Sequence, residues 1–391
     1  MMTSENLRTL RMDQVGSLAA APRLREAYER QTRGEAPAED LDRVRDEVIR
    51  DYIRKQEAIG MPIVTDGEFR RRNFQESFGA AVSGFDVAPE GPDHSRDHVN
   101  RAPLERAEQD FDAQGPPIVT RRPVVERLRL VRNVPLEEYR FSSAVATRAV
   151  KVTLLSPDRI SQRFAYERSG GVYKDVDEFL ADVVAIEREM VRGLVEAGCR
   201  YIQIDAPGYT AYVDPPSLER MRARGEDPDA NLERSIRADN AVIEGLEGVT
   251  FGIHFCRGNP RTIDLATGRI VPQWHRVGTY DSIAEQLFTG LKHHRLLLEY
   301  DSERAGSFEP LRFVPRDKIV VLGLVTTKSE AIESLDDLRR RIDAATRHLP
   351  LEQLALSPQC GFGGTGSVVL PEDVQWQKLR RVVETARAVW G

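Results

Sequence analysis

A histidine and a cysteine two residues apart, His254 and Cys256, are the sharpest chemical signal in this sequence of 391 residues. They end the apolar run that begins at Thr250. Alternate side chains of a β-strand point to the same face, so the imidazole and the thiol would lie side by side. Taken alone, such a pair is more typical of core packing than of a metal site. Further ligands are needed to tell the two apart.

Two further candidate ligands, Glu299 and Cys360, each follow an apolar run of strand length. Cys360 opens a glycine-rich loop, where a thiol is partly exposed and its reactivity is useful. Glu299 closes the run Leu296–Leu298, and a carboxylate at the end of a buried strand is costly unless it is paired or binds a metal. Taken singly, Glu299 is equally compatible with a salt bridge to Arg304 or Arg257.

The elements that must position these residues follow from the hydrophobic pattern. Apolar runs of strand length alternate with longer amphipathic stretches, as in repeated βα units. We expect strands over Met12–Gly16, Pro62–Thr65, Ala149–Leu155, Tyr201–Ile204, Thr250–Phe255, Arg295–Glu299, Lys318–Val325 and Leu354–Leu356. We expect helices over Leu41–Ile59, Val176–Ala197, Asp229–Leu246, Asp281–Lys292, Ser334–Arg347 and Asp373–Val389. The sequence therefore predicts an α/β fold, a (β/α)₈ TIM-type barrel that forms a single domain over residues 1–391.

One segment departs from this alternation. Ala88–Pro117 is polar, rich in proline and highly charged, which indicates an insertion between the second and third strands on the loop face. The following residues, Ile118–Val134, are expected to form a hairpin or short extra strands. The insertion therefore separates the first two βα units from the rest of the barrel.

The position of the polar residues favours a metal site over scattered core polar groups. Active sites of such barrels are built at the carboxyl ends of the strands. The four candidate ligands fall there, and so do Ser17, Asp66, Glu68 and Asp205. Two thiolates, one imidazole and one carboxylate suit zinc better than magnesium or calcium, which prefer oxygen ligands. We therefore predict a zinc ion bound by His254, Cys256, Glu299 and Cys360.

Composition excludes several classes of partner and location. The net charge of -6 argues against nucleic acid and anionic membranes. No apolar stretch approaches ~18 residues, and the polar N-terminus lacks the apolar core of a signal peptide. We therefore expect a cytoplasmic protein with reduced thiols. The third cysteine, Cys199, precedes its strand, and we interpret it as a small buried hydrophobic residue.

Several of these segments resemble the catalytic barrel of cobalamin-independent methionine synthase. The resemblance covers residues 13–364 and rests on His254-Phe255-Cys256, Glu299, Cys360-Gly361, Ile202-Gln203-Ile204-Asp205-Ala206-Pro207, Val15-Gly16-Ser17 and Asp66-Gly67-Glu68. It implies that the four ligands hold zinc, that Ser17, Glu68 and Asp205 bind the substrate, and that Glu68 and Asp205 serve in catalysis.

The resemblance also implies a reaction, the transfer of an alkyl group, most simply methyl, to a thiol such as homocysteine. Zinc lowers the pKa of a bound thiol and keeps it as a thiolate at neutral pH. The expected partners are a small-molecule thiol acceptor and an alkyl donor, and self-association into a homo-oligomer is compatible with such a barrel. Glu299 would be the labile ligand that the substrate sulfur displaces.

Three positions depart from the family pattern, the first near the thiol acceptor and the other two in the machinery for the methylfolate donor. Ala206 replaces an acidic residue, Val325-Thr326-Thr327-Lys328 lacks the family's acid histidine, and Val152-Thr153-Leu154-Leu155-Ser156 lacks the tryptophan that stacks on folate. Single-barrel relatives include the epoxyalkane:coenzyme M transferases, so thiol addition to an epoxide or another electrophile is an alternative. A zinc hydrolase with Asp205 or Glu68 as general base is an alternative of another class, and a purely structural zinc is a third.

Overall fold

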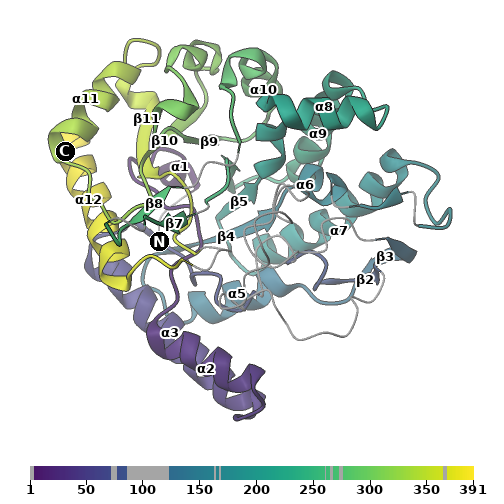
Figure 1. Ribbon diagram of the computed structural model, residues 1–391, viewed down its shortest axis with the longest axis horizontal. Helices are drawn as coiled ribbons and strands as arrows, with labels where there is room; N and C mark the ends of the chain where they lie inside the picture. Colours follow the sequence, from purple (N-terminus) through teal and green to yellow (C-terminus); the bar gives the residue numbers. More distant parts are fainter. Residues whose placement is uncertain are drawn as a thin grey trace.

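Seven parallel strands form the centre of the molecule, a curled sheet surrounded by helices (Figure 1). The computed structural model describes residues 4–71, 77–85, 123–162, 164–166, 169–259, 261–264, 267–272, 276–363 and 368–391. The strands follow one another in the sheet in the order β1 (Ile63–Val64), β4 (Ala149–Leu155), β5 (Tyr201–Asp205), β6 (Thr250–Phe255), β9 (Arg295–Glu299), β10 (Ile319–Val325) and β11 (Leu354–Pro358). All neighbours are parallel, so their carboxyl ends meet at one edge.

The helices form an outer layer because parallel strands require crossover connections that cover the sheet. The α-helices among the described residues are α1 (Ser4–Arg8), α2 (Pro22–Thr32), α3 (Ala38–Ala58), α5 (Val134–Ser143), α6 (Pro157–Gln162), α7 (Val176–Glu196), α8 (Pro215–Ala223), α9 (Pro228–Ile243), α10 (Ala284–Gly290), α11 (Leu335–Ala345) and α12 (Glu372–Trp390). Local signals set several helix starts: the Asp175 side chain caps α7 and the Ser334 hydroxyl caps α11. Short 3-10 turns also follow several strands, among them η3 (Pro207–Val213) after β5.

The first expected strand, Met12–Gly16, is not a regular strand. It lies between the two edge strands of the sheet, with isolated parallel bridges from Met12 to Leu356 and from Ser17 to Gly67. The ladder is interrupted because the amide of Gln14 donates to the carboxylate of its neighbour Asp13 at 2.8 Å instead of to a strand. The described residues thus form seven regular strands of the eight that were expected.

Buried charges fill the amino-terminal end of the sheet. The Asp13 carboxylate accepts from Lys151 Nζ at 2.8 Å and from Arg295 Nη2 at 3.1 Å, and all three side chains are fully buried. Tyr201 donates its hydroxyl to the same carboxylate. Helix α1 contacts β6 beside this cluster. Paired charges therefore occupy this end of the sheet, and the candidate ligands follow the carboxyl ends of the strands.

The expected insertion at Ala88–Pro117 lies outside the described residues. Next to it, β2 (Val82–Phe85) pairs antiparallel with β3 (Val124–Leu130), which confirms the short extra strand expected within Ile118–Val134. A second small hairpin joins β7 (Arg261–Ile263) to β8 (Ile270–Pro272) after β6. Within the described ranges no helix is both long enough and apolar enough to cross a membrane.

Candidate metal centre

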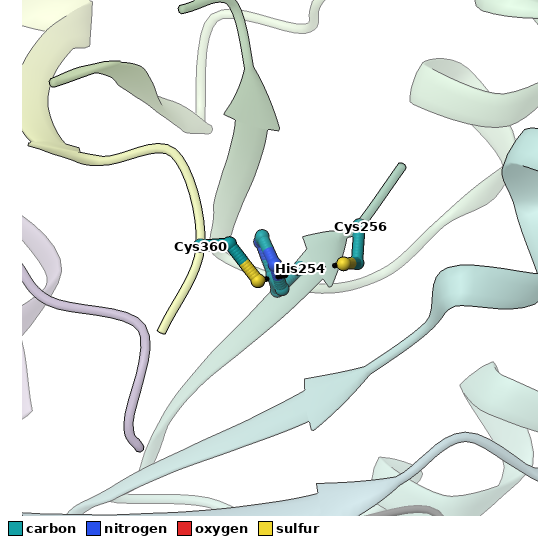
Figure 2. A group of neighbouring side chains, drawn as sticks. All are labelled: His254, Cys256 and Cys360. Carbon is teal, nitrogen blue, oxygen red and sulfur yellow. Dashed lines mark hydrogen bonds between the residues drawn. The ribbon is translucent and has the colours of Figure 1, made fainter. Parts of the chain in front are cut away.

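Three of the four predicted ligands, His254, Cys256 and Cys360, lie together at the carboxyl edge of the sheet (Figure 2). Their ligand atoms all fall within 4.8 Å of one another, and the two sulfur atoms are 3.4 Å apart. Two cysteines on one tetrahedral zinc, with Zn–S bonds of about 2.3 Å, would hold their sulfurs about 3.8 Å apart. Both thiols are free cysteines, so the arrangement fits a metal ion with little movement.

The histidine of this group is buried without a partner. His254 is 2% exposed, and neither ring nitrogen has a hydrogen bond within the described part of the chain. A buried imidazole without a partner is costly, and a metal ion would satisfy one nitrogen. Burial alone lowers the pKa of His254, but the neighbouring Cys256 and the carboxylates of Asp205 and Glu299 outweigh burial and raise it.

The two thiols have opposite pKa shifts. The pKa of Cys256 lies well below its usual range, mainly because its sulfur shares a hydrogen bond with Cys360. His254 and the Gly258 amide lower this pKa further. The same hydrogen bond raises the pKa of the Cys360 thiol, with burial as the second cause. The shared hydrogen bond thus favours ionisation of Cys256 over Cys360, and a cation at this point would favour two thiolates.

A polar network holds the Cys360 loop beside β6. The Asn259 side chain donates to Gly361 O at 2.9 Å, and the Thr327 hydroxyl donates to the same carbonyl at 3.1 Å. The Gln359 carboxamide oxygen accepts from the Thr327 amide. Only glycine fits at position 361, because a Cβ atom there would lie 2.0 Å from Ser17 Oγ. The loop therefore places Gly361, the neighbour of Cys360, directly against Ser17.

Glu299, the fourth predicted ligand, lies next to this group but is bound to other residues. One carboxylate oxygen accepts from Lys328 Nζ at 2.8 Å and Arg304 Nη2 at 2.6 Å, and the other accepts from the Arg257 amide at 3.0 Å. The salt bridge to Arg304 is the alternative that the sequence left open. Glu299 is fully buried at the end of β9, as its sequence context predicted.

Lys328 lies beside the candidate metal centre, and sequence reasoning did not single it out. Its fully buried ammonium bridges Glu299 and Asp301 at 2.8 and 3.0 Å. Burial lowers the pKa of Lys328, but the two carboxylates outweigh burial and raise it. The sequence signal that could have identified Lys328 is its position shortly after the seventh expected strand. Lys328 neutralises the carboxylate that stands beside the three other candidate ligands.

Replacing Lys328 by methionine should destabilise the fold strongly. The change preserves length but leaves two buried carboxylates with less compensation, which typically costs about 3–5 kcal/mol. Chemical denaturation of both proteins measures this free energy of unfolding. The control is Lys292→Met, which breaks the exposed pair with Glu244 and should cost at most about 1 kcal/mol. Equal losses in both variants would contradict the buried ion pair as a determinant of stability.

The predicted substrate residues lie at the same edge of the sheet. Ser17 is half-buried next to Gly361, and Glu68 accepts a hydrogen bond from the Thr153 hydroxyl at 2.8 Å. Glu68 has a φ of +60°, a left-handed conformation that non-glycine residues rarely adopt. Such strain is typical of functional sites, where the surrounding structure enforces it. Here the Glu68 amide donates to Asp66 Oδ1 at 2.9 Å.

Asp205, the third predicted substrate residue, lies at the end of β5 and has a raised pKa. Burial raises its pKa to about 7, His254 opposes this, and Glu68 adds to it. One carboxylate oxygen accepts from Gln203 Nε2 at 2.7 Å. A carboxyl group with this pKa changes its charge near neutral pH, which is where a general base or a cation-binding group is useful.

Cys199 lies at the opposite end of its strand, as predicted. It is fully buried, and burial raises the pKa of its thiol to about 12. A thiol in this state behaves as a small hydrophobic residue and not as a ligand. It provides a matched control for the other two cysteines.

Comparison with known proteins identifies the family. The sequence matches the catalytic domain of the cobalamin-independent synthases over residues 11–238 and 296–387. The chain belongs to this family. The matched segments include Ser17, Glu68, Asp205, Glu299 and Cys360, whereas His254 and Cys256 lie in the interval between the two segments. The resemblance seen in the sequence is thereby confirmed.

Several similar proteins align with nearly the whole of this chain. YxjH of Bacillus subtilis, an uncharacterised protein, is 34% identical over 386 residues, which are 97% of this chain and 94% of YxjH. The methionine synthase of Pyrococcus abyssi is 24% identical over 96% of this chain and 91% of its own. A candidate vitamin-B12-independent methionine synthase from Listeria monocytogenes has the same fold, with a TM-score of 0.72, 24% identity and 97% coverage of both chains.

Proposed function

We propose that this protein is a zinc-dependent thiol alkyltransferase, acting as one domain over residues 1–391. In this proposal His254, Cys256 and Cys360 hold the ion, and Glu299 is a fourth, exchangeable ligand. A bound zinc ion would lower the pKa of an incoming thiol and keep it as a nucleophilic thiolate. The observation that carries the proposal is the convergence of two thiols and an unpartnered imidazole within 4.8 Å, in a chain of the cobalamin-independent synthase family.

The chain's own residues would supply the acceptor site. Glu68 and Asp205 are carboxyl groups, buried or nearly so, at the edge where the ligands meet. They suit the ammonium group of an amino-acid thiol, for which homocysteine is the natural candidate in this family. Ser17, in contact with the Cys360 loop, would bind the same molecule. The proposed acceptor is therefore an amino-acid thiol, and the proposed transferred group is methyl.

The methyl donor should be more activated than methyltetrahydrofolate. The leaving nitrogen of methylfolate must be protonated, and a positioned acid contributes roughly 10²–10⁴-fold to such steps. Thr327 is bonded to Asn259 and Gly361, and Lys328 is held by Glu299 and Asp301. We therefore expect transfer from methyltetrahydrofolate to be slower than transfer from a methylated corrinoid, a sulfonium or an epoxide.

A side-by-side turnover assay tests this function and the choice of donor. Zinc-loaded protein and homocysteine are mixed with each donor at matched concentration, and the alkylated thiol is quantified by mass spectrometry. Product from any donor, lost on chelation and restored by zinc, supports the alkyltransferase. Product from none of the four donors would refute it. Methylfolate turnover at a rate equal to that of the other donors would show that the missing acid histidine does not matter.

A further inference from the structure

A buried arginine beside the metal centre lacks a negatively charged partner. Arg261, at the start of β7, is 6% exposed and forms no ion pair with any residue that the structure describes. One terminal nitrogen, Nη1, has no hydrogen bond within the described part of the chain, while Nη2 donates to Phe362 O at 3.0 Å. Burying an unpaired charge is expensive, so such a group indicates a missing anion.

Two other buried arginines, Arg71 and Arg295, show what Arg261 lacks, whereas the fully buried Arg257 resembles Arg261 and donates to the Gly278 carbonyl. Arg71 is bonded to the Glu138 carboxylate at 2.7 Å, and Arg295 is bonded to Asp13 at 3.1 Å. In each case a buried carboxylate compensates the guanidinium. Arg261 has only a carbonyl oxygen, and burial lowers its pKa to about 10, with the Cys360 sulfur partly opposing the effect. Among the described residues, Arg71 and Arg295 thus each have a carboxylate partner and Arg261 has none.

The contacts of Arg261 place its unbonded Nη1 group close to the candidate metal centre. Its carbonyl partner, Phe362 O, lies two residues after Cys360, and the Phe362 amide donates to Ser17 O at 2.8 Å. Asn259 holds the adjacent carbonyl of Gly361. Arg261 is therefore bound to the loop that carries both Cys360 and the contact with Ser17.

We infer that Arg261 binds an acidic group, a carboxylate or a sulfonate, of the thiol acceptor. The inference rests on the proposed function, because it requires the sulfur of the acceptor to reach the metal centre. It restricts the acceptor to thiols that carry a negative charge a few bonds away from sulfur. A guanidinium with a free edge forms charge-assisted hydrogen bonds to such a group.

Two thiols that differ only in charge test this specificity. Zinc-loaded protein is titrated calorimetrically with 3-mercaptopropionate and with 3-mercaptopropionamide. Wild type should bind the carboxylate at least about tenfold more tightly, since charge-assisted hydrogen bonds are roughly twice as strong as neutral ones. In Arg261→Gln this ratio should fall to within about twofold. Arg261→Lys keeps the charge without the planar fork and should retain a severalfold preference.

Asn259→Ala is the matched control. It removes a hydrogen bond to the same loop without a change of charge, so it can weaken both thiols but should leave their ratio at the wild-type value. Equal affinities of wild type for the two thiols, or a ratio unchanged in Arg261→Gln, would overturn the inference alone. Failure of both thiols to bind wild type would overturn the proposed function as well. If Arg261→Gln does not fold, the wild-type and Arg261→Lys ratios still decide the outcome.

Discussion

Cys256→Ser and Cys360→Ser should each lose most of the bound zinc, whereas wild type should carry about one zinc ion per chain. Each substitution removes one of two thiolates that lie 3.4 Å apart, and serine is a poor zinc ligand at neutral pH. Loss of a partner outside the ligand shell already costs 10–100-fold in metal affinity, so loss of a ligand should cost more. Atomic emission measurement of protein purified without added metal gives the occupancy.

Cys199→Ser is the control for this measurement. It makes the same chemical change at a fully buried cysteine at the opposite end of the sheet, so it should affect stability but not zinc content. Circular dichroism establishes that all three variants are folded before their zinc is compared. Equal zinc in wild type and in folded Cys360→Ser would refute the proposed ligand set.

Asp205→Asn should raise KM for an amino-acid thiol by roughly 10- to 150-fold, because one charge-assisted hydrogen bond is worth about 1.5–3 kcal/mol. The proposed partner of Asp205 is the ammonium group of the acceptor. Homocysteine is therefore compared with 4-mercaptobutyrate, which lacks the amine. The substitution should weaken the first thiol selectively. An unchanged KM together with lost turnover would instead assign Asp205 to catalysis.

The preference for homocysteine over 4-mercaptobutyrate should depend on pH, and the raised pKa of Asp205 determines its direction. Burial raises the pKa of Asp205 to about 7, so in the folded protein the group is mostly protonated at pH 6 and mostly ionised at pH 8. The preference for homocysteine over 4-mercaptobutyrate should therefore increase as pH rises from 6 to 8. In Asp205→Asn the ratio should stay flat. A wild-type ratio that falls with pH would contradict an ammonium site at Asp205.

Local pattern alone was enough to predict much of the scaffold. The apolar runs at Ala149–Leu155, Thr250–Phe255 and Arg295–Glu299 form β4, β6 and β9 with the expected bounds. The two-residue spacing of His254 and Cys256 placed both side chains on one face, as the structure shows. Strand periodicity depends only on neighbours along the chain, and it can be read without knowledge of the partner strands.

The same local reasoning was insufficient at Met12–Gly16. The apolar pattern there predicts a strand, but Asp13 belongs to a buried ionic cluster with Lys151 and Arg295. Its carboxylate takes the Gln14 amide away from the ladder. These partners are distant in sequence, and the competition between a side chain and a strand for one amide is decided by the folded environment.

What the sequence by itself determined is the set of candidate donors and the edge of the sheet at which they lie. Only the tertiary structure decided that Cys360 meets Cys256, that Glu299 pairs with Lys328 and Arg304, and that Arg261 has no anion among the residues with described positions. The reason is physical. Strand direction and side-chain alternation are short-range properties, but the partner of a long charged side chain depends on which loops the fold brings within hydrogen-bonding distance.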